Sequence, residues 1–358
     1  MCGLAGICDT SGNNISGETI IRAMAVQRDR GNGLGAGYAG YGIYPDFAEH
    51  YCFHMMFDSQ DAKEEADLFF DRLFKVDRSE PIPTQKTPGI DAGPLLWRYF
   101  VKVDPLTLEQ ACVSEEDYVV DAVMAINTTI SGAFVASSGK NMGVFKGVGF
   151  PEEIGHFYRL DEYEGHTWTA HNRFPTNTPG WWGGAHPFSL LDFSIVHNGE
   201  LSSYGINARY VEQFGYHCTM GTDTEVVAYL FDKMMRKDGL TSLQACQALA
   251  APLWSEIDDM DDEERAYFTH LRKKYSSAML NGPFAIILGT NEGFVAFNDR
   301  IKLRPLVAAQ KGSVVYVASE ESSIREVCDL PDKVWTPRAG EAVVARLQSA
   351  PACKVEVA

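Results

Sequence analysis

The feature that most constrains the fold is an apolar segment at the start of the chain. Residues 2–8 read Cys-Gly-Leu-Ala-Gly-Ile-Cys, so every side chain is small or apolar. A short apolar run of this kind is typical of a fully buried strand. We therefore predict that the chain enters a sheet with its first residues, and that Cys2 stands at the beginning of a buried strand.

Cys2 is the first candidate catalytic residue. Removal of Met1 would leave Cys2 with a free α-amino group, whose pKa is ordinarily about 8. Such an amine can take the thiol proton near neutral pH, which is the arrangement of an N-terminal nucleophile that carries its own base. The alternative interpretation is an ordinary buried cysteine, and Cys2 alone does not decide between the two.

The chain divides into a larger domain, residues 1–45 and 140–358, and an inserted α+β lobe, residues 46–139. In the lobe the patterns indicate strands at 51–57, 95–103 and 132–137, helices at 62–74 and 114–126, and a proline-rich loop at 79–94. This order suggests a β-α-β-β-α-β unit of the ferredoxin type. The lobe is interpreted either as a decoration or as a docking surface for another subunit, and we favour docking.

The larger domain is rich in strand patterns. They lie at 142–148, 167–173, 188–197, 314–318 and 341–347, and an Asn-Glu-Gly turn at 291–293 predicts a hairpin. Thr222 and Glu225 have the spacing of a capping box, which predicts a helix beginning at Asp223. We interpret Glu225 as explained by that box.

Composition excludes several classes of function. The chain has 358 residues and a net charge of −17, so nucleic acid or an anionic membrane surface would repel it. No uncharged apolar stretch of about 18 residues predicts a membrane span. The eight cysteines include no C-x-x-C pair, which argues against a metal site; without a recognisable signal peptide they are typical of reduced thiols in the cytoplasm.

Polar motifs stand where strands end and where a helix begins. Arg173 ends an apolar strand, where a guanidinium can bind a carboxylate, and Thr176 could add a hydroxyl donor. After the next strand, Asn198 and Gly199 could aim a side-chain amide and a backbone N–H at an oxyanion. Asp223 could pair with a substrate ammonium group.

Each motif also has an ordinary explanation. Arg173 fits a surface arginine, the Asn-Gly pair fits a turn, and Asp223 fits the field at a helix N-terminus. In combination, a thiol, an oxyanion hole and two opposite charges suit one substrate class, a free α-amino acid with a hydrolysable side-chain amide. That amino acid is glutamine.

The other polar side chains receive structural interpretations. We expect His171 to be a satisfied histidine of the core or its rim. Lys140, Lys146 and the acidic run 258–264 are expected to lie on solvated faces.

Several motifs together resemble a known family, the class II glutamine amidotransferases. The similar segments are Met-Cys-Gly-Leu-Ala-Gly-Ile at 1–7, Arg-Asp-Arg-Gly at 28–31, His-Asn-Gly-Glu at 197–200 and Gly-Thr-Asp-Thr-Glu at 221–225. Within that family, residues 173–181 and 185–188 resemble the glutaminase domain of glutamate synthases. The resemblance covers about 1–45 and 141–347, and it implies the α+β fold of the N-terminal-nucleophile hydrolases, an αββα sandwich of four layers.

The resemblance also implies roles for the site residues. Cys2 is the implied nucleophile, and Arg173 and Asp223 are the implied ligands of the glutamine carboxylate and amine. Asn198 and Gly199 are the implied oxyanion hole. By the same resemblance, the reaction needs no cofactor in this chain.

Further assignments rest on the same resemblance. Thr176 is an implied helper in substrate binding, and residues 175–184 are a candidate lid. Arg30 and Gly31 match a motif beside the nucleophile, with a purely structural role in the N-terminal sheet as the alternative. Because the chain lacks a flavin-binding barrel and iron–sulfur cysteines, the implied protein is a separate subunit that passes ammonia to a synthase partner, which would hold the flavin and the iron–sulfur cluster.

The sequence thus predicts a glutaminase subunit of a glutamate-synthase-type enzyme. Three alternatives remain open: a hydrolase acting on another amide such as an acylase, an amidotransferase that serves another acceptor, and a catalytically silent regulatory subunit. The pair of Arg173 and Asp223 argues against the acylase, because an acyl chain has no zwitterionic end.

Overall fold

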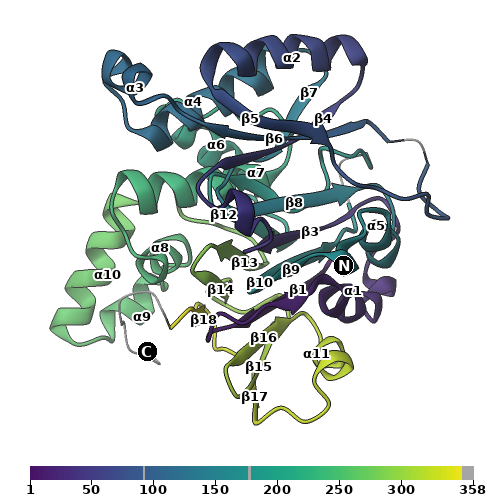
Figure 1. Ribbon diagram of the computed structural model, residues 1–358. Helices are drawn as coiled ribbons and strands as arrows, with labels where there is room; N and C mark the ends of the chain where they lie inside the picture. The colour runs from purple at the N-terminus through teal and green to yellow at the C-terminus, as the bar shows by residue number, and fades with distance from the viewer. Residues whose placement is uncertain (92, 176–178, 349–358) are drawn as a thin grey trace.

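Two antiparallel sheets stacked face to face form the body of the molecule (Figure 1). The computed structural model describes residues 1–91, 93–175 and 179–348. The seven-stranded sheet runs in the order β17 (Lys333–Trp335), β15 (Val307–Lys311), β16 (Val314–Ala318), β1 (Gly3–Asp9), β10 (Thr167–Asn172), β3 (Ala36–Tyr41) and β8 (Met142–Gly147). The five-stranded sheet runs β11 (Phe188–Leu190), β12 (Phe193–Gly199), β13 (Phe284–Thr290), β14 (Gly293–Asn298) and β18 (Ala342–Arg346).

The interface between the sheets is a dry apolar layer. Leu4 and Cys8 of β1 meet Val196 of β12 there, and all three are fully buried. Gly6 lets the sheets approach, since a Cβ at that position would lie 2.9 Å from Val317 and 3.4 Å from Ile287 of the opposite sheet. The predicted N-terminal strand is therefore confirmed, and it lies in the middle of the larger sheet.

Helices cover the outer face of each sheet. The seven-stranded sheet is covered by α1 (Gly17–Ala25), α5 (Pro151–Phe157) and α11 (Glu321–Val327). The five-stranded sheet is covered by α7 (Asp223–Asp232), its π-helical extension η4 (Lys233–Lys237) and α8 (Ser242–Leu249), with α6 (Tyr204–Glu212) packed on α7. Two further helices, α9 (Trp254–Asp258) and α10 (Asp262–Lys274), stand beside α8 (Figure 1). This is the predicted αββα sandwich.

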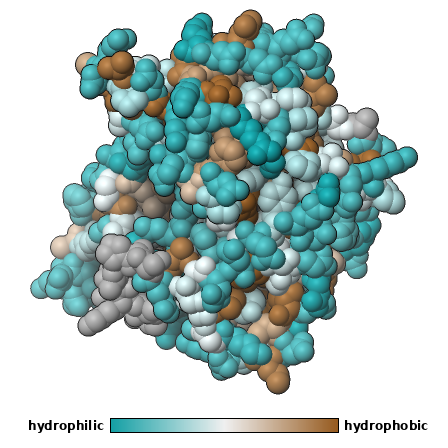
Figure 2. Space-filling model, viewed as in Figure 1, coloured by the Kyte–Doolittle hydropathy of each residue, from teal (hydrophilic) through white to brown (hydrophobic). Residues whose placement is uncertain are grey.

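The shorter elements complete the body. They are the strand pair β2 (Ile15–Ser16) and β9 (Glu164–Gly165), and the 3₁₀ turns η1 (Arg28–Arg30), η2 (Pro45–Phe47) and η3 (Leu160–Glu162). No helix in the described ranges is both long and apolar enough to cross a membrane. The face seen in Figure 2 is mainly hydrophilic, and its apolar side chains are scattered.

The lobe carries a third sheet at one end of the sandwich (Figure 1). Its elements are β4 (Tyr51–Phe57), α2 (Gln60–Leu73), β5 (Lys75–Pro81), β6 (Leu95–Lys102), α3 (Pro105–Ala111), α4 (Glu115–Thr129) and β7 (Ala133–Ser137). The strand order β5-β6-β4-β7, with every neighbour antiparallel, is that of a ferredoxin-type unit. The domain boundaries themselves stay a prediction.

Two elements of the lobe differ from the prediction. Strand β5 was not expected, and its last residues lie in the segment predicted as a loop. The strand is charged and largely exposed, so its sequence lacks the apolar pattern of a strand. It is held instead by antiparallel pairing with β6. Helix α3 was also missed; Asp104 caps it and Pro105 opens it.

The lobe and the sandwich share one apolar core. Phe53, Phe70 and Val123 of the lobe belong to the same buried cluster as Val226 and Leu230 of α7. The lobe is therefore packed onto the helical layer of the five-stranded sheet.

Candidate active site

A pocket of about 330 Å³ opens where β1, β10, β12 and α7 converge. Its walls are formed by Cys2, Arg173, Phe174, Pro175, His186, His197, Gly199, Glu200, Leu201, Tyr204, Gly221, Thr222 and Asp223. Four of the predicted site residues, Cys2, Arg173, Gly199 and Asp223, thus meet in one cavity although up to 221 positions separate them in sequence (223 − 2).

Cys2 is placed by the pairing of β1 with β10. Because Gly3 lies opposite Asn172, the residue before β1 lies beside the residue after β10. The Sγ atom of Cys2 accepts a hydrogen bond from the backbone N–H of Phe174, at 3.3 Å. The nucleophile candidate is therefore held at the mouth of the pocket by a backbone donor.

The surroundings of the Cys2 thiol disfavour its ionisation. Burial raises the pKa of the thiol, and the backbone N–H of Phe174 and the nearby positive charges only partly oppose this effect. Those charges are the Met1 ammonium group, Arg173 and Arg304. A thiol with a raised pKa needs a base beside it in order to attack a carbonyl.

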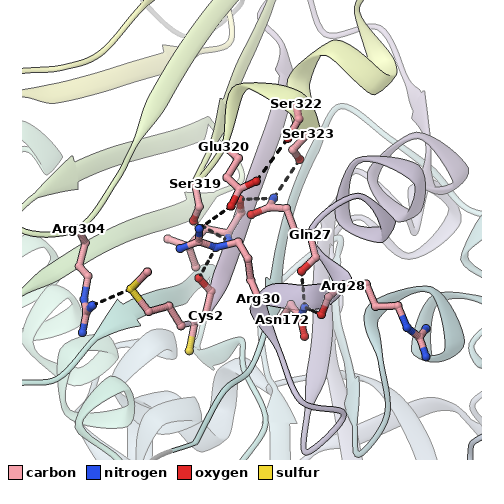
Figure 3. Close-up of polar contacts among 12 residues, drawn as sticks. Cys2, Gln27, Arg28, Arg30, Asn172, Arg304, Ser319, Glu320, Ser322 and Ser323 are labelled. Atoms are coloured by element: carbon pink, nitrogen blue, oxygen red, sulfur yellow. Dashed lines mark hydrogen bonds and ion pairs between the residues drawn. The ribbon is translucent and has the colours of Figure 1, made fainter.

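Arg30 reaches across to the backbone of Cys2 (Figure 3). Its Nε donates to the carbonyl oxygen of Cys2 at 3.0 Å, and its Nη1 pairs with Glu320 at 2.6 Å. Leu4, the second residue of β1, is held as well, since its N–H donates to Ser319 Oγ at 3.0 Å. The first residues of β1 therefore have little freedom to move.

Gly31 packs against the end of β10, where a larger residue would not fit. A Cβ there would lie 1.9 Å from Oδ1 of Asn172. The Asn172 amide in turn donates to the carbonyl oxygens of Gln27 and Arg28, at 2.7 and 3.0 Å. Arg30 thus contacts the backbone of Cys2, and Gly31 packs on Asn172, the residue opposite Gly3. A part for this motif in the reaction stays a prediction.

Arg173 lies on one side of the pocket. Its backbone N–H donates to Gly35 O at 2.8 Å, which continues the sheet by one residue beyond β10. Only 5% of the residue is exposed, and its Nη1 reaches Pro179 O at 3.5 Å. The guanidinium therefore places a positive charge at the pocket, while most of the residue is shielded from water.

Asp223 supplies the opposite charge at the first position of α7. Its Oδ2 accepts from Leu201 N–H at 3.0 Å, and its Oδ1 lies 3.5 Å from His197 Nδ1. Burial alone would raise the pKa of this carboxyl, but His197 and the hydrogen bonds together hold the pKa below its usual value. Asp223 is therefore an anion at neutral pH.

Asn198 and Gly199 end β12 next to the pocket. Gly199 is required by close packing, since a Cβ there would lie 2.1 Å from Pro283 O. Asn198 is 1% exposed, and its Nδ2 has no hydrogen-bond partner within the described ranges. A buried amide donor without a partner costs free energy, and the role of Asn198 as an oxyanion donor stays a prediction.

Two polar predictions were wrong. Glu225 does not close a capping box: Thr222 accepts from Thr224 N–H, and the Glu225 carboxylate accepts from Thr219 and Met220 N–H, both at 2.9 Å. The turn before the helix folds back over the carboxylate, and that pairing depends on tertiary structure.

The prediction that Lys146 lies on a solvated face was also wrong. The residue is 2% exposed instead of solvated, because its strand β8 is covered by the chain segment that precedes β11. Lys140 is half-buried and lies 3.4 Å from Glu115. His171 is fully buried, as predicted, and its Nε2 lies 3.0 Å from His197 O. Its Nδ1 has no hydrogen-bond partner among the described residues, so the expected satisfied histidine is confirmed for one nitrogen only.

Sequence reasoning also missed part of the pocket wall. His186 and His197 were quoted only within motifs, and Tyr204 at the start of α6 had no distinguishing signal. Thr176 lies outside the described residues, as does part of the candidate lid 175–184. Within the described part of the chain, no group of three or more His, Cys, Asp or Glu side chains could hold a metal ion.

Comparison with known proteins supports one family. The sequence model described as glutamine amidotransferases class-II matches residues 91–334. That range includes Arg173, Asn198, Gly199 and Asp223, while Cys2 precedes it.

Two relatives match this chain over most of their length. An uncharacterized protein of Archaeoglobus fulgidus is 50% identical over 97% of this chain and 93% of its own length. A protein of Methanothermobacter thermautotrophicus, provisionally named a glutamine amidotransferase, is 26% identical over 92% of this chain and 94% of its own. Among solved structures, the allosteric regulatory enzyme of purine biosynthesis aligns with a TM-score of 0.51 and 15% identity; the match covers 95% of this chain but 46% of that one, and it shows the fold alone.

Proposed function

The chain belongs to the class II glutamine amidotransferases, and we propose that it hydrolyses glutamine through a thioester on Cys2 and delivers the ammonia to a synthase subunit. One observation carries the proposal. The pocket wall holds a thiol, a buried arginine and an ionised aspartate. Asn198, directly before the wall residue Gly199, has an amide donor without a partner among the described residues. These groups complement a zwitterionic amino acid that has a reactive side-chain carbonyl.

Substrate binding follows from the charges. Arg173 takes the α-carboxylate of glutamine in a charge-assisted hydrogen bond, and Asp223 takes the α-ammonium group. The two charges fix the backbone end of the substrate, so the side-chain amide extends toward Cys2. A pocket of about 330 Å³ suits a ligand of this size.

The reaction balances as an acyl transfer to sulfur followed by hydrolysis. The α-amine of Cys2 accepts the thiol proton, the sulfur attacks the side-chain carbon, and the carbonyl oxygen takes the negative charge between Asn198 Nδ2 and Gly199 N–H. The C–N bond breaks as the amine returns its proton to the leaving nitrogen, which departs as ammonia. Water then attacks the thioester, releasing glutamate and restoring the thiol.

Removal of Met1 is a necessary part of this proposal. While Met1 is attached, the nitrogen of Cys2 is an amide and cannot serve as a base. The raised pKa of the Cys2 thiol makes that base essential. We therefore propose that the active protein begins at Cys2.

The acceptor of the ammonia is the finer part of the proposal. Resemblance of residues 173–181 to glutaminase domains of glutamate synthases supports a synthase partner of that type. The partner would hold any flavin and iron–sulfur cluster, with no cofactor in this chain. The seven cysteines in the described ranges are free thiols, which supports a cytoplasmic location.

The test is a glutaminase assay on the purified chain, alone and with its co-purifying partner. We expect equimolar glutamate and ammonia from wild type, a mass that lacks Met1, and loss of more than about 10³-fold in rate for Cys2→Ala. The matched control is Cys8→Ala, which removes a buried thiol of the same strand outside the pocket. Retained glutamine hydrolysis in Cys2→Ala, or an intact Met1 in an active preparation, would refute the mechanism.

A further inference from the structure

Lys146 is a buried cation that the proposed reaction does not use. It lies on β8 opposite Gly37, and 2% of it is exposed. Its Nζ donates to Gly183 O at 3.0 Å and stands 4.2 Å above the ring centroid of Phe188. Lysine is almost never buried to this extent without a partner, so the position calls for a reason.

Glu225 approaches the same place from α7. It is 1% exposed, and its carboxylate holds the N–H groups of Thr219 and Met220, immediately before the pocket residues 221–223. Lys146 and Glu225 both line a small cavity of about 10 Å³. Its volume is about that of one water-sized probe and its walls carry polar groups, so one water molecule can bridge the two side chains.

The two side chains therefore attach to two segments that lead into the wall of the glutamine pocket, 183–186 and 219–223, here called its two walls. Lys146 holds Gly183, three residues before His186, which lines the pocket. Glu225 holds the turn that leads into Asp223. The first wall also contacts the residue that follows the second, since His186 Nε2 lies 3.3 Å from Thr224 Oγ1.

Charged groups from three elements face Lys146. Glu225 lies on α7, Arg173 follows β10, and His186 precedes β11. Burial lowers the pKa of Lys146 to about 7, with Arg173 acting in the same direction and Glu225 against it. Burial also lowers the pKa of His186, so that ring stays neutral near pH 7. Burial also raises the pKa of Glu225, and the hydrogen bonds from Thr219, Met220 and Tyr229 oppose that rise. Lys146 is thus a group here whose charge can change near neutral pH.

We propose that Lys146 and Glu225 form a buried positioning pair that sets the spacing between the two walls of the glutamine pocket. The inference rests on the proposed function, because it assigns the pair to glutamine binding. Attraction across the small cavity draws the 183–186 segment toward the start of α7. When Lys146 loses its proton the attraction ends, the walls separate slightly, and glutamine binds less tightly.

The central test is Lys146→Met, which keeps the length of the side chain and its packing on Phe188 but removes the charge and the donor. At pH 6.5 we expect KM for glutamine to rise about tenfold while kcat changes less than about threefold, since the reacting groups are untouched. In wild type, KM should rise about tenfold between pH 6 and 8 as Lys146 deprotonates, and this pH dependence should disappear in the variant.

Lys140→Met is the matched control, because Lys140 pairs with Glu115 outside the pocket. It should leave KM and its pH profile unchanged. Glu225→Gln should raise KM like Lys146→Met, and the double variant should add little, since both remove one interaction. A purely structural role for Lys146 would lower the unfolding midpoint and leave KM and the pH profile of the folded enzyme as they are, which would overturn the proposal.

A second readout does not depend on glutamine turnover. Backbone amide hydrogen exchange without ligand should quicken over 179–186 and 217–221 in Lys146→Met, and not in Lys140→Met. If wild type fails to hydrolyse glutamine while exchange still quickens in Lys146→Met, the proposed function fails and the positioning pair stands. If wild type is active and Lys146→Met changes neither exchange nor KM, the positioning pair is refuted.

Discussion

The sandwich and the inserted lobe use their interiors differently. In the sandwich, buried polar groups gather at one pocket: Arg173, His186 and His197 line it, and Asn198 precedes the wall residue Gly199 with an Nδ2 that has no partner in the described ranges. In the lobe, the side chains buried between the sheet and its helices are mostly apolar, as at Phe53 and Phe70. The difference teaches that buried polar groups gather in the sandwich and not in the lobe, although one apolar core runs through both.

The largest expected effect is on stability, in the lobe. Phe70 is fully buried and stacks on Tyr99 with 4.1 Å between ring centroids. Phe70→Ala should lower the free energy of unfolding by about 3–5 kcal/mol, measured by urea denaturation, without changing kcat of the folded protein. Leu68→Ala, on the same helix and 73% exposed, should change stability by less than about 0.5 kcal/mol. A fall in kcat with Phe70→Ala would erase the contrast between the regions.

A change of similar size is expected on the rate, in the sandwich. Asn198→Ala removes an oxyanion donor, which should lower kcat about 10²–10³-fold, or about 2.7–4 kcal/mol. Its Nδ2 makes no hydrogen bond in the described protein, so stability should change little. Asn207→Ala is the control, because Asn207 Nδ2 donates to Ser277 O at 2.8 Å and its loss should cost stability and leave kcat intact. Equal kcat values for the two variants would contradict the assignment.

Asp223→Asn should act mainly on binding. Losing a charge-assisted contact with the substrate ammonium group should cost about 1.5–3 kcal/mol, seen as a roughly 10–100-fold rise in KM for glutamine.

The pKa of Asp223 adds a test by pH. Because the folded pKa is lowered, the ionised carboxyl stabilises the protein above its unfolded pKa of about 3.9, and this contribution is lost as pH falls through the folded value. The stability difference between wild type and Asp223→Asn should therefore shrink below pH 4 in urea titrations. A difference that stays constant down to pH 2 would show that the carboxyl is not held in this way.

The smallest effect is expected where the two regions meet through charge. Asp117 of the lobe lies 2.6 Å from Arg236 Nη1, but its side chain is 37% exposed, and Arg236 is already held by Asp232 at 2.7 and 2.8 Å. Asp117→Asn should thus cost about 0–1 kcal/mol and leave KM unchanged. A loss above about 2 kcal/mol would mean that ion pairing, and not the shared apolar core, fixes the lobe to the sandwich.

Part of the site could be predicted from short sequence motifs. Arg173 directly follows β10, Asn198 and Gly199 end β12, and Asp223 opens α7, as their flanking patterns indicated. These predictions were possible because strand ends and helix caps have local signatures. The catalytic and binding roles of these residues stay predictions.

The failures share one physical cause. Lys146 is a charged residue whose burial depends on a segment some forty positions away. The Glu225 carboxylate accepts hydrogen bonds from the turn before α7 and not from the N-cap residue of its own helix. Strand β5 likewise owes its form to the ladder with β6. Each outcome depends on a partner distant in sequence or on a turn shaped by its surroundings, which local patterns do not encode.

The sequence by itself determined the N-terminal strand and the chemical kinds of the site residues, because apolar runs and caps act over a few residues. The sandwich class came from the resemblance to the class II glutamine amidotransferases and not from these local patterns. Only the tertiary structure decided that Cys2, Arg173 and Asp223 share one pocket, and that Lys146 lies buried behind it. The register of β1 against β10 places the first pair side by side, and the stacking of the second sheet brings α7 to them. Such convergence is a property of long-range packing, since the free energy that holds it comes from the whole core.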